Sequence, residues 1–436
     1  MSIQASLRER IRADIDSFPV FDTHEHLLPS HLAVFEHMHL IRFLSHSYAR
    51  QDFISAGLRP DFWERFWGNS GLDPAQEKPA QDWQALRPFL RASRNTAYCR
   101  YLLAACRDLH AFAAPDLDED NWMALSNQIE AAYRRPDWFG YVLGEKCRVK
   151  VALNDQTWGG VDAGYDSRFI RPVFRIDEFM VGDPTIKNMW GTSAAALAER
   201  WGVPIRDFES FMAALDEGFR RHQAGGARAI KVAAAYWRSL ESQLVSRLEA
   251  ERNFNQFIRG QYGADLGKVG DYVLGYAIEK AIAMGWPVQV HTGMLASNGS
   301  WLEYSKPTHL NRLFLQYPDA RFDVFHGGYP YSEELGVLAK LFPNVYLDTC
   351  WLPLISPRAA ADQLSKWLEL VPSNKLLWGG DSRLVEQTYG SLLALKDVLA
   401  EVLADKVARG YFNIDLALEV AANVMWRNGA ALFRWE

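Results

Sequence analysis

The sequence predicts an α/β protein built as a (β/α)8 TIM barrel with a large helical insertion after the first strand. Short apolar segments of strand type alternate with helical segments along most of the chain, and eight strands can be counted. Polar side chains of metal-binding type stand at or near the ends of several of these strands. An open doubly wound sheet is the alternative architecture, although no G-x-G-x-x-G motif opens a helix.

The first two elements bring a His-x-His pair to the end of a buried strand. Residues 4–17 have apolar side chains at helical spacing, and residues 18–23 form an apolar strand that leads into His24 and His26. Residues two apart in a strand point to the same face, so both imidazoles can bind one metal ion. Glu25 between them points away, and we do not expect it to be the catalytic base.

Residues 27–147 are expected to form a helical insertion within a single barrel domain that covers residues 1–436. Apolar residues recur there at spacings of three and four, and tryptophan is frequent. A second His-x-His, His37 and His39, lies in a stretch of helical pattern. Residues two apart diverge on a helix, so this pair is not expected to bind metal.

Strands and helices alternate in the rest of the chain. The helices are expected near 207–223, 266–284, 308–316, 331–341 and 358–370, and further helices fill the C-terminal end. The second to eighth strands are expected at 148–153, 169–174, 227–233, 287–291, 321–326, 344–348 and 375–379.

Histidine and aspartate mark the ends of the later strands. The fifth strand ends in His291, the sixth ends in His326, and Asp381 follows the eighth. The active sites of such barrels lie at the C-terminal ends of the strands. These three residues are therefore expected to meet His24 and His26 around a divalent metal.

Lys231, within the fourth strand, has several interpretations. If it is carbamylated, Lys231 would bridge two cations. If it is unmodified, it would bind a substrate carboxylate or have a structural role. Asp381 can ligate the metal and accept a proton from a metal-activated water, and His326 can bind a second metal or polarise a substrate oxygen. Arg238 and Arg383 are candidates for binding a substrate carboxylate through the planar guanidinium.

Composition excludes other classes of function. Lysine and arginine number 47 against 53 acidic residues, a net charge of −6 without a basic stripe, so a nucleic-acid partner is not expected. No apolar run approaches the length of a membrane span and the N-terminus lacks a signal-peptide pattern, which predicts a soluble cytoplasmic protein acting on a small molecule. The sequence leaves open whether the protein forms a homo-oligomer. Four cysteines without C-x-x-C spacing are expected to be reduced and mostly buried: Cys99, Cys106, Cys147 and Cys350.

This set of strand-end residues resembles the amidohydrolase superfamily, and within it the amidohydrolase-2 branch. Residues 289–294, 326–331 and 342–348 are similar to the amidohydrolase-like half of proteins fused to a glutamine-synthetase-like domain, and the insertion is similar to that of uronate isomerases. The resemblance implies a distorted barrel, one or two divalent metals, with zinc the first expectation and manganese the second, and hydrolysis by a metal-activated water.

The resemblance assigns metal and catalytic positions to the histidines and to Asp381, but it leaves the reaction open. The leading hypothesis is hydrolysis of an amide, ester or lactone carbonyl in a small, carboxylate-bearing substrate. The alternatives are a uronate-type isomerase or a metal-dependent decarboxylase on the same site, and a scaffold without activity. Fold similarity alone does not choose among them.

Overall fold

The computed structural model describes residues 3–64, 66, 77–155, 164–188 and 191–435. Its centre is one parallel eight-stranded sheet in which the strands follow their sequence order. The strands are β1 (Val20–Glu25), β2 (Val149–Asp155), β3 (Ile170–Arg175), β4 (Ile230–Val232), β5 (Val288–Val290), β6 (Phe322–Val324), β7 (Val345–Asp348) and β8 (Leu376–Leu377).

Backbone hydrogen bonds join the two edges of this sheet. Thr23 N donates to Trp378 O at 3.2 Å, and Asp381 N donates to His24 O at 2.8 Å. These bonds connect β1 to the segment that follows β8, so the strands form a ring with their side chains filling the interior. The (β/α)8 barrel is confirmed.

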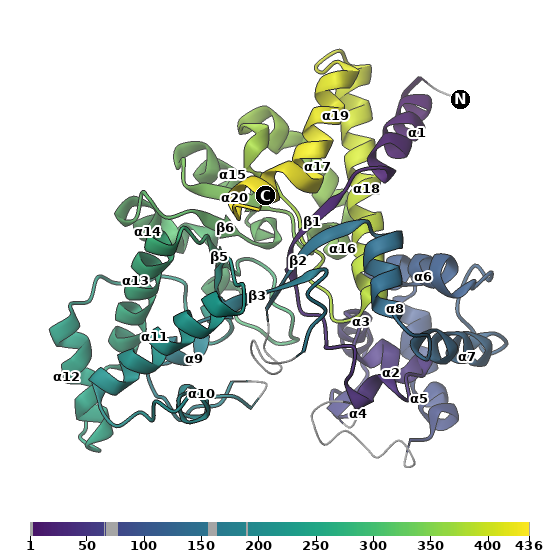
Figure 1. Cartoon of the computed structure of the whole chain (residues 1–436). Helices are drawn as coiled ribbons and strands as arrows, with labels where there is room; N and C mark the ends of the chain where they lie inside the picture. Colours follow the sequence, from purple (N-terminus) through teal and green to yellow (C-terminus); the bar gives the residue numbers. More distant parts are fainter. Residues whose placement is uncertain (1–2, 65, 67–76, 156–163, 189–190, 436) are drawn as a thin grey trace.

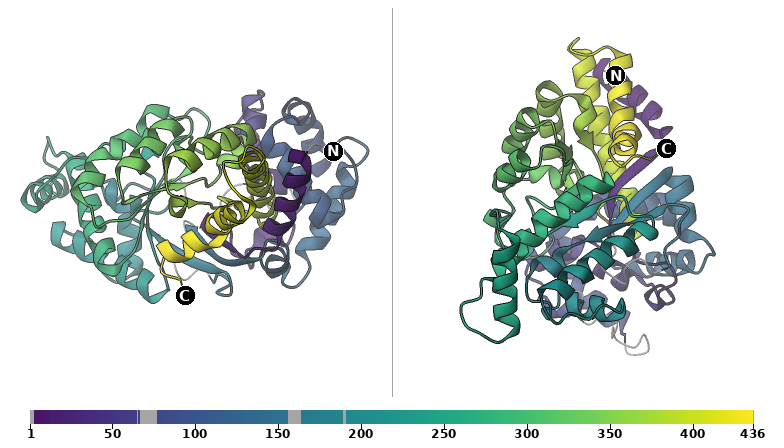
Figure 2. Two further views of the ribbon diagram at one scale, coloured as in Figure 1. Left: turned by 90° about the horizontal axis from the view of Figure 1, so that it is seen from above. Right: turned by 60° about the vertical axis from the view of Figure 1, so that its left-hand side comes forward.

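Helices cover the outside of the ring (Figure 1). Helix α1 (Ile3–Asp16) precedes β1 and packs on α18, which Figure 2 also shows. The later helices are α9 (Asp177–Met180), α10 (Ala194–Arg200), α11 (Phe208–Ala224), α12 (Arg247–Ile258), α13 (Leu266–Met284), α14 (Asn311–Gln316), α15 (Ser332–Leu341), α16 (Leu352–Ile355), α17 (Pro357–Leu370), α18 (Val385–Ala408), α19 (Ile414–Ala422) and α20 (Asn428–Leu432).

Local chemistry sets the ends of these helices. Helix α11 begins with a capping box in which the Asp207 side chain accepts from Ser210 N, and the Ser210 hydroxyl accepts from the backbone of Asp207. Helix α13 ends at Gly285, whose φ of 66° is the left-handed conformation that glycine adopts without strain.

The segment between β1 and β2 is helical and has an apolar cluster of its own. Its helices are α2 (Leu40–Ser45), α3 (Ala49–Ser55), α4 (Asp61–Glu64), α5 (Pro79–Ser93), α6 (Ala97–His110), α7 (Trp122–Tyr133) and α8 (Trp138–Gly140). In that cluster Trp83 stacks on Trp122 with ring centroids 5.2 Å apart. Trp351 and Leu384 of the barrel belong to the same cluster, and α6 packs on α18. We infer that residues 27–147 fold together with the barrel as one domain.

The second His-x-His lies outside regular helix, contrary to the expected pattern. His39 is the N-cap of α2, and its ring contacts the carboxylate of Glu77, which also pairs with Arg42. His37 is exposed. A capping contact and an ion pair therefore account for His39, which does not join the strand-end residues.

Candidate metal centre

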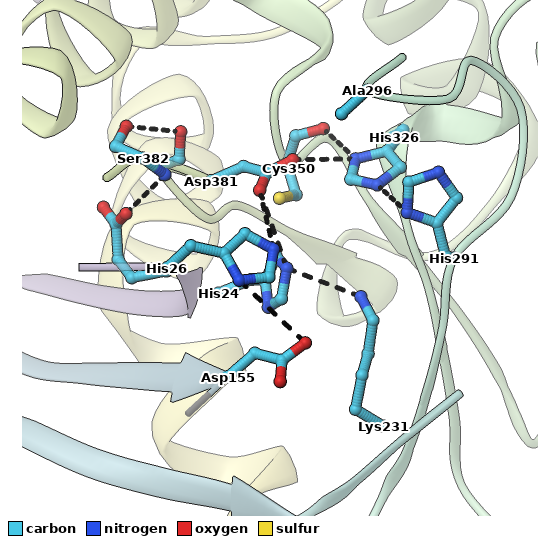
Figure 3. A network of polar contacts seen from close by, with 12 residues as sticks. His24, His26, Asp155, Lys231, His291, Ala296, His326, Cys350, Asp381 and Ser382 are labelled. Carbon is cyan, nitrogen blue, oxygen red and sulfur yellow. Dashed lines mark hydrogen bonds and ion pairs between the residues drawn. The ribbon is translucent and has the colours of Figure 1, made fainter. Parts of the chain in front are cut away.

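Three side chains from the two ends of the chain meet at the mouth of the barrel. His24 Nε2 lies 3.6 Å from Asp381 Oδ1, and His26 Nε2 lies 3.5 Å from the same oxygen (Figure 3). Atoms bound to one zinc ion at about 2.1 Å in a tetrahedron are themselves roughly 3.4 Å apart. Each imidazole nitrogen therefore lies at the distance from Asp381 Oδ1 that two ligands of one cation have.

The backbone of Asp381 explains how its carboxylate reaches the histidines. Its φ is +51°, a left-handed conformation that is uncommon outside glycine. The peptide N–H of Asp381 donates to His24 O, which joins the two ligand segments directly. The neighbouring Glu25 turns away and accepts from Ser382 N at 2.6 Å, which agrees with its exclusion as a base.

Asp155, at the end of β2, belongs to this group although the sequence analysis missed it. Its Oδ2 lies 4.0 Å from His26 Nδ1 and 2.9 Å from Arg175 Nη2, and its side chain is fully buried. The expected second strand ended at residue 153, two residues too early. The polar pair Asn154-Asp155 directly after an apolar run was the signal that could have located this ligand.

The residues present fit a divalent cation. In the described part of the chain, Oδ1 of Asp155 and Oδ1 of Asp381 are buried without a hydrogen-bond partner. Leaving such groups unsatisfied costs about 1–3 kcal/mol each. A cation bound to such an oxygen removes this cost. The barrel supplies the imidazole and carboxylate donors that zinc prefers.

Lys231 is fully buried beside these ligands. Its Nζ lies 3.4 Å from His24 Nε2 and 3.7 Å from the centre of the Phe325 ring. Burial lowers the pKa of Lys231 to about 8, although the nearby carboxylate of Asp155 raises it. A readily deprotonated amine suits carbamylation, and its position also suits contact with a substrate, so both interpretations remain.

His291 and His326 lie together next to the metal group, but they do not share its central oxygen. His291 Nε2 lies 3.0 Å from Met294 O, and its Nδ1 lies 2.9 Å from His326 Nε2. Both ring nitrogens of His291 thus contact these two groups in the structure, and the role of His291 as a ligand of the same ion as His24 stays a prediction. His326 Nδ1 instead lies 3.7 Å from the second oxygen of Asp381, Oδ2.

The two candidate arginines have different positions. Arg383 lines the cavity in front of the metal group, whereas Arg238 does not. Arg238 pairs with Asp271 of α13 at 2.6 Å, and its Nη1 lies 3.3 Å from Gly267 O. The structure therefore gives no support to the expectation that Arg238 binds substrate. Helix α13, which precedes β5, supplies the carboxylate with which Arg238 forms its ion pair.

The cavity encloses about 620 Å³ of empty space, counting the solvent at its mouth. Burial raises the pKa of Asp381 to about 6, while Lys231 and a hydrogen bond from Tyr48 lower it. Burial and the charge of Arg383 together lower the pKa of Arg50 to about 9. The cavity is lined by His26, His46, Ser47, Tyr48, Arg50, Arg175, Tyr236, His291, Ala296, Asp381 and Arg383.

Two of these lining arginines were not found from the sequence. Arg50 comes from α3 of the insertion, and Arg175 ends β3, where the expected strand stopped one residue earlier. Three guanidinium groups, with Arg383, therefore face one cavity beside the metal group. This arrangement favours an anionic ligand.

A barrel with histidine and aspartate ligands at its strand ends defines a class of metal-dependent enzymes. The chain belongs to the amidohydrolase family, because residues 199–435, more than half of it, match the family's sequence model. This family implies a divalent metal and a small-molecule substrate. Among curated proteins, FluG of Emericella nidulans is 38% identical over 149 residues, which span 34% of this chain and 17% of the fungal protein. In the part that the structure describes, no helix has the length and apolar character needed to cross a membrane.

Solved structures share the fold along the whole chain. Glucuronate isomerase of Caulobacter crescentus superposes with a TM-score of 0.79 at 16% identity, covering 99% of this chain and 95% of that one. Uronate isomerase of Thermotoga maritima superposes with a TM-score of 0.77 at 15% identity, covering 98% of this chain and 97% of that one. A metal-dependent hydrolase from Lactobacillus casei superposes with a TM-score of 0.64 at 19% identity, covering 97% of each chain. At these identities the likeness concerns the fold alone.

Proposed function

We propose that the protein is a metal-dependent hydrolase that cleaves an amide, ester or lactone in a small molecule bearing a carboxylate. The observation that carries the proposal is the convergence of His24 Nε2 and His26 Nε2 on Asp381 Oδ1, at 3.6 and 3.5 Å, beside a cavity lined by arginine. Membership of the amidohydrolase family supports this chemistry.

His24 and His26 would hold the cation together with Asp155, whose ligand atom lies within 4.8 Å of theirs, and with Asp381. When bound, a divalent metal lowers the pKa of water and polarises a carbonyl group. Zinc fits the nitrogen and oxygen donors, and manganese is the alternative. We propose that each chain binds one or two ions, because Lys231 and His326 lie close enough to the first site to take part in a second one.

Asp381 is placed to move the proton. Its carboxylate is buried at the floor of the cavity, where it can accept a proton from the attacking water and return it to the leaving group. Tyr48 donates a hydrogen bond to Asp381 and keeps the carboxylate oriented. His326, hydrogen-bonded to His291, is the candidate for polarising the substrate oxygen.

The arginines would orient the substrate. Arg383 lies two residues after Asp381 and faces the same cavity, so a carboxylate bound to its guanidinium would lie near the reacting carbonyl. Arg50 faces the cavity from the insertion and Arg175 faces it from β3. Arg175 also pairs with Asp155 at 2.9 Å.

Isomerisation of a hexuronate is the second candidate function. The two uronate isomerases superpose on nearly the entire chain, and the insertion that carries Arg50 is included in that match. Such a substrate has the carboxylate that these arginines favour. In this reaction Asp381 would move a proton between neighbouring carbon atoms of the sugar instead of activating water. The third candidate function is decarboxylation of a carboxylate-bearing substrate at the same site.

Elemental analysis and a substrate panel test these functions together. The purified protein is assayed with N-acyl amino acids, lactones, hexuronates and aromatic acids, beside the variants His24→Ala and Asp381→Asn. Hydrolysis that both variants abolish while the fold is kept would support the proposal. Turnover of hexuronates alone would favour the isomerase, carbon dioxide release would favour the decarboxylase, and undiminished activity in both variants would refute the site.

A further inference from the structure

Two adjacent side chains tie the turn that follows Arg383 to the helical insertion. Helix α18 begins at Val385, so Glu386 and Gln387 lie in its first turn, directly after the segment that carries Arg383. Both side chains are buried, with exposed fractions of 0% and 5%. A buried polar group is costly unless it is hydrogen-bonded, so the partners of these two side chains identify what holds the turn in place.

Three separate helices of the insertion contact the carboxylate of Glu386. Trp138 Nε1 of α8 donates to Oε1 at 3.1 Å, and His110 Nε2 of α6 lies 3.2 Å from the same oxygen. The Tyr133 hydroxyl of α7 donates to Oε2 at 2.8 Å. The N-terminal turn of a long helix also favours the negative charge of Glu386. This carboxylate therefore holds the start of α18 against the insertion.

Gln387 joins the backbone of Arg383 to the backbone of the insertion. Its Oε1 accepts from Arg383 N at 3.3 Å, and its Nε2 donates to His46 O at 3.0 Å. A peptide N–H only donates and a carbonyl only accepts, so the two partners also fix the orientation of the amide. His46 ends α2 and lines the cavity, as does Arg50 of the next helix, α3. One amide therefore connects the two segments that carry Arg383 and Arg50.

The two backbone groups of Arg383 are held from different sides. Leu28 N, in the segment after β1, donates to Arg383 O at 3.2 Å, whereas the N–H of Arg383 donates to Gln387. Loss of the Gln387 amide therefore releases the N–H side of Arg383 and leaves its carbonyl side attached to the barrel.

The separation of Arg383 from Arg50 matters because both cations line one cavity. Their mutual repulsion adds to burial in lowering the pKa of Arg50 to about 9. Like charges that lie close together move apart unless the surrounding structure restrains them. The contact from Arg383 through Gln387 to His46 is such a restraint, and it keeps the two guanidinium groups ready for an anion before one binds.

We propose that Gln387 is a positioning residue that sets the place of Arg383 relative to Arg50, and so determines how strongly the site prefers a carboxylate-bearing substrate. Glu386 supports this role by holding the same helical turn against the insertion. The inference rests on the proposed function for the anion site that the arginines form. It adds that the barrel and the insertion select the substrate jointly, through one shared amide.

A double-mutant cycle of Gln387→Met and Arg383→Met in the full-length protein tests the proposal. kcat and KM are measured for the best carboxylate-bearing substrate of the panel and for its neutral amide. Gln387→Met alone should raise KM for the carboxylate about 5- to 10-fold and change kcat, and KM for the amide, by less than about twofold. Added to Arg383→Met, it should change kcat/KM by less than about twofold, because a residue that acts through a guanidinium has no effect once that group is gone.

Gln363→Met is the matched control. Gln363 is also a buried glutamine, but it donates to Ser332 O at 3.3 Å between α17 and α15 and lies outside the cavity. This variant should leave the ratio of kcat/KM for the charged and neutral substrates unchanged. The metal content of every variant should equal that of the wild type, because Asp381 N is bonded to His24 O and not to Gln387.

The outcomes separate this proposal from the proposed function. Equal losses for the charged and the neutral substrate, or a full further loss from Gln387→Met in the Arg383→Met background, would overturn the positioning role. If Gln387→Met does not fold, Gln387→Asn takes its place, because the shorter amide cannot reach both partners; an unchanged preference for the carboxylate would then overturn the proposal. Turnover of hexuronates alone would overturn the proposed hydrolysis, and the same cycle on the hexuronate and its amide would decide the role of Gln387. No turnover of any carboxylate-bearing substrate of the panel would overturn both.

Discussion

Replacing Arg383 with methionine is expected to lower kcat/KM for a carboxylate-bearing substrate by about 10- to 100-fold. A hydrogen bond to a charged group contributes about 1.5–3 kcal/mol, and each 1.4 kcal/mol corresponds to about tenfold. Methionine keeps much of the apolar stem, so packing against the cavity wall changes little. The effect should be small for a neutral analogue in which an amide replaces the carboxylate, because the lost interaction is with charge.

Arg238→Met is the matched control, with the opposite expected result. Arg238 pairs with the buried Asp271 at 2.6 Å and lies outside the cavity, so kcat/KM should stay within about twofold of the wild type. Its loss leaves Asp271 without its cation, although Gln243 N still donates to it at 2.9 Å. Because Arg238 is 24% exposed, the free energy of unfolding should fall by only about 1–2 kcal/mol.

The assay combines steady-state kinetics on the best substrate of the panel with urea unfolding of each variant. Arg383→Met should be impaired in catalysis at nearly unchanged stability, and Arg238→Met should be impaired in stability at nearly unchanged catalysis. If both arginines lower kcat/KM to the same extent, or if Arg383→Met turns over the charged and neutral substrates with unchanged preference, the assignment of the anion site is refuted.

Three further predictions concern the metal, pH and the insertion. His24→Ala should reduce the metal content measured by elemental analysis to less than half of the wild-type value, and an unchanged content would contradict the ligand assignment. Burial raises the pKa of Asp52 from 3.8 to about 6. The folded state therefore binds the proton of this carboxyl group more tightly than the unfolded chain does. The stability that the protonated Asp52 contributes is lost as pH rises from about 4 to about 6. Asp52→Asn should therefore unfold at higher urea concentration than the wild type above pH 6 but not below pH 4; equal differences at both pH values would contradict this. Trp83→Ala removes a fully buried ring stacked on Trp122 and should lower the free energy of unfolding by about 3–5 kcal/mol, measured by urea denaturation; a loss below 1 kcal/mol would show that the insertion does not unfold with the barrel.

The ends of the strands were predicted well where a strand has one clear pattern. The His-x-His of β1 and the aspartate after β8 meet because parallel strands of a closed barrel bring their carboxyl ends to one rim. Asp155 was missed because an apolar pattern does not show where a strand ends in polar residues. Arg50 was missed for a different reason, since the position of a helix in the insertion relative to the rim depends on packing across more than three hundred residues.

The direction of each side chain was the least predictable feature. His291 ends its strand as expected, but a carbonyl three residues later and the ring of His326 take up both of its nitrogens. Arg238 and Arg383 looked alike as isolated cations near strand ends. Arg238 pairs with Asp271 of α13, whereas Arg383 lines the cavity.

The amino-acid order alone determined the barrel, the helical insertion and the three residues whose atoms converge at 3.5 to 3.6 Å, because alternation of apolar residues and strand-end position are local properties. Tertiary structure decided which groups surround each histidine, which arginine reaches the cavity and that Cys350 lies beside Asp381. These depend on rotamers and hydrogen bonds between segments that only the closed ring brings into contact.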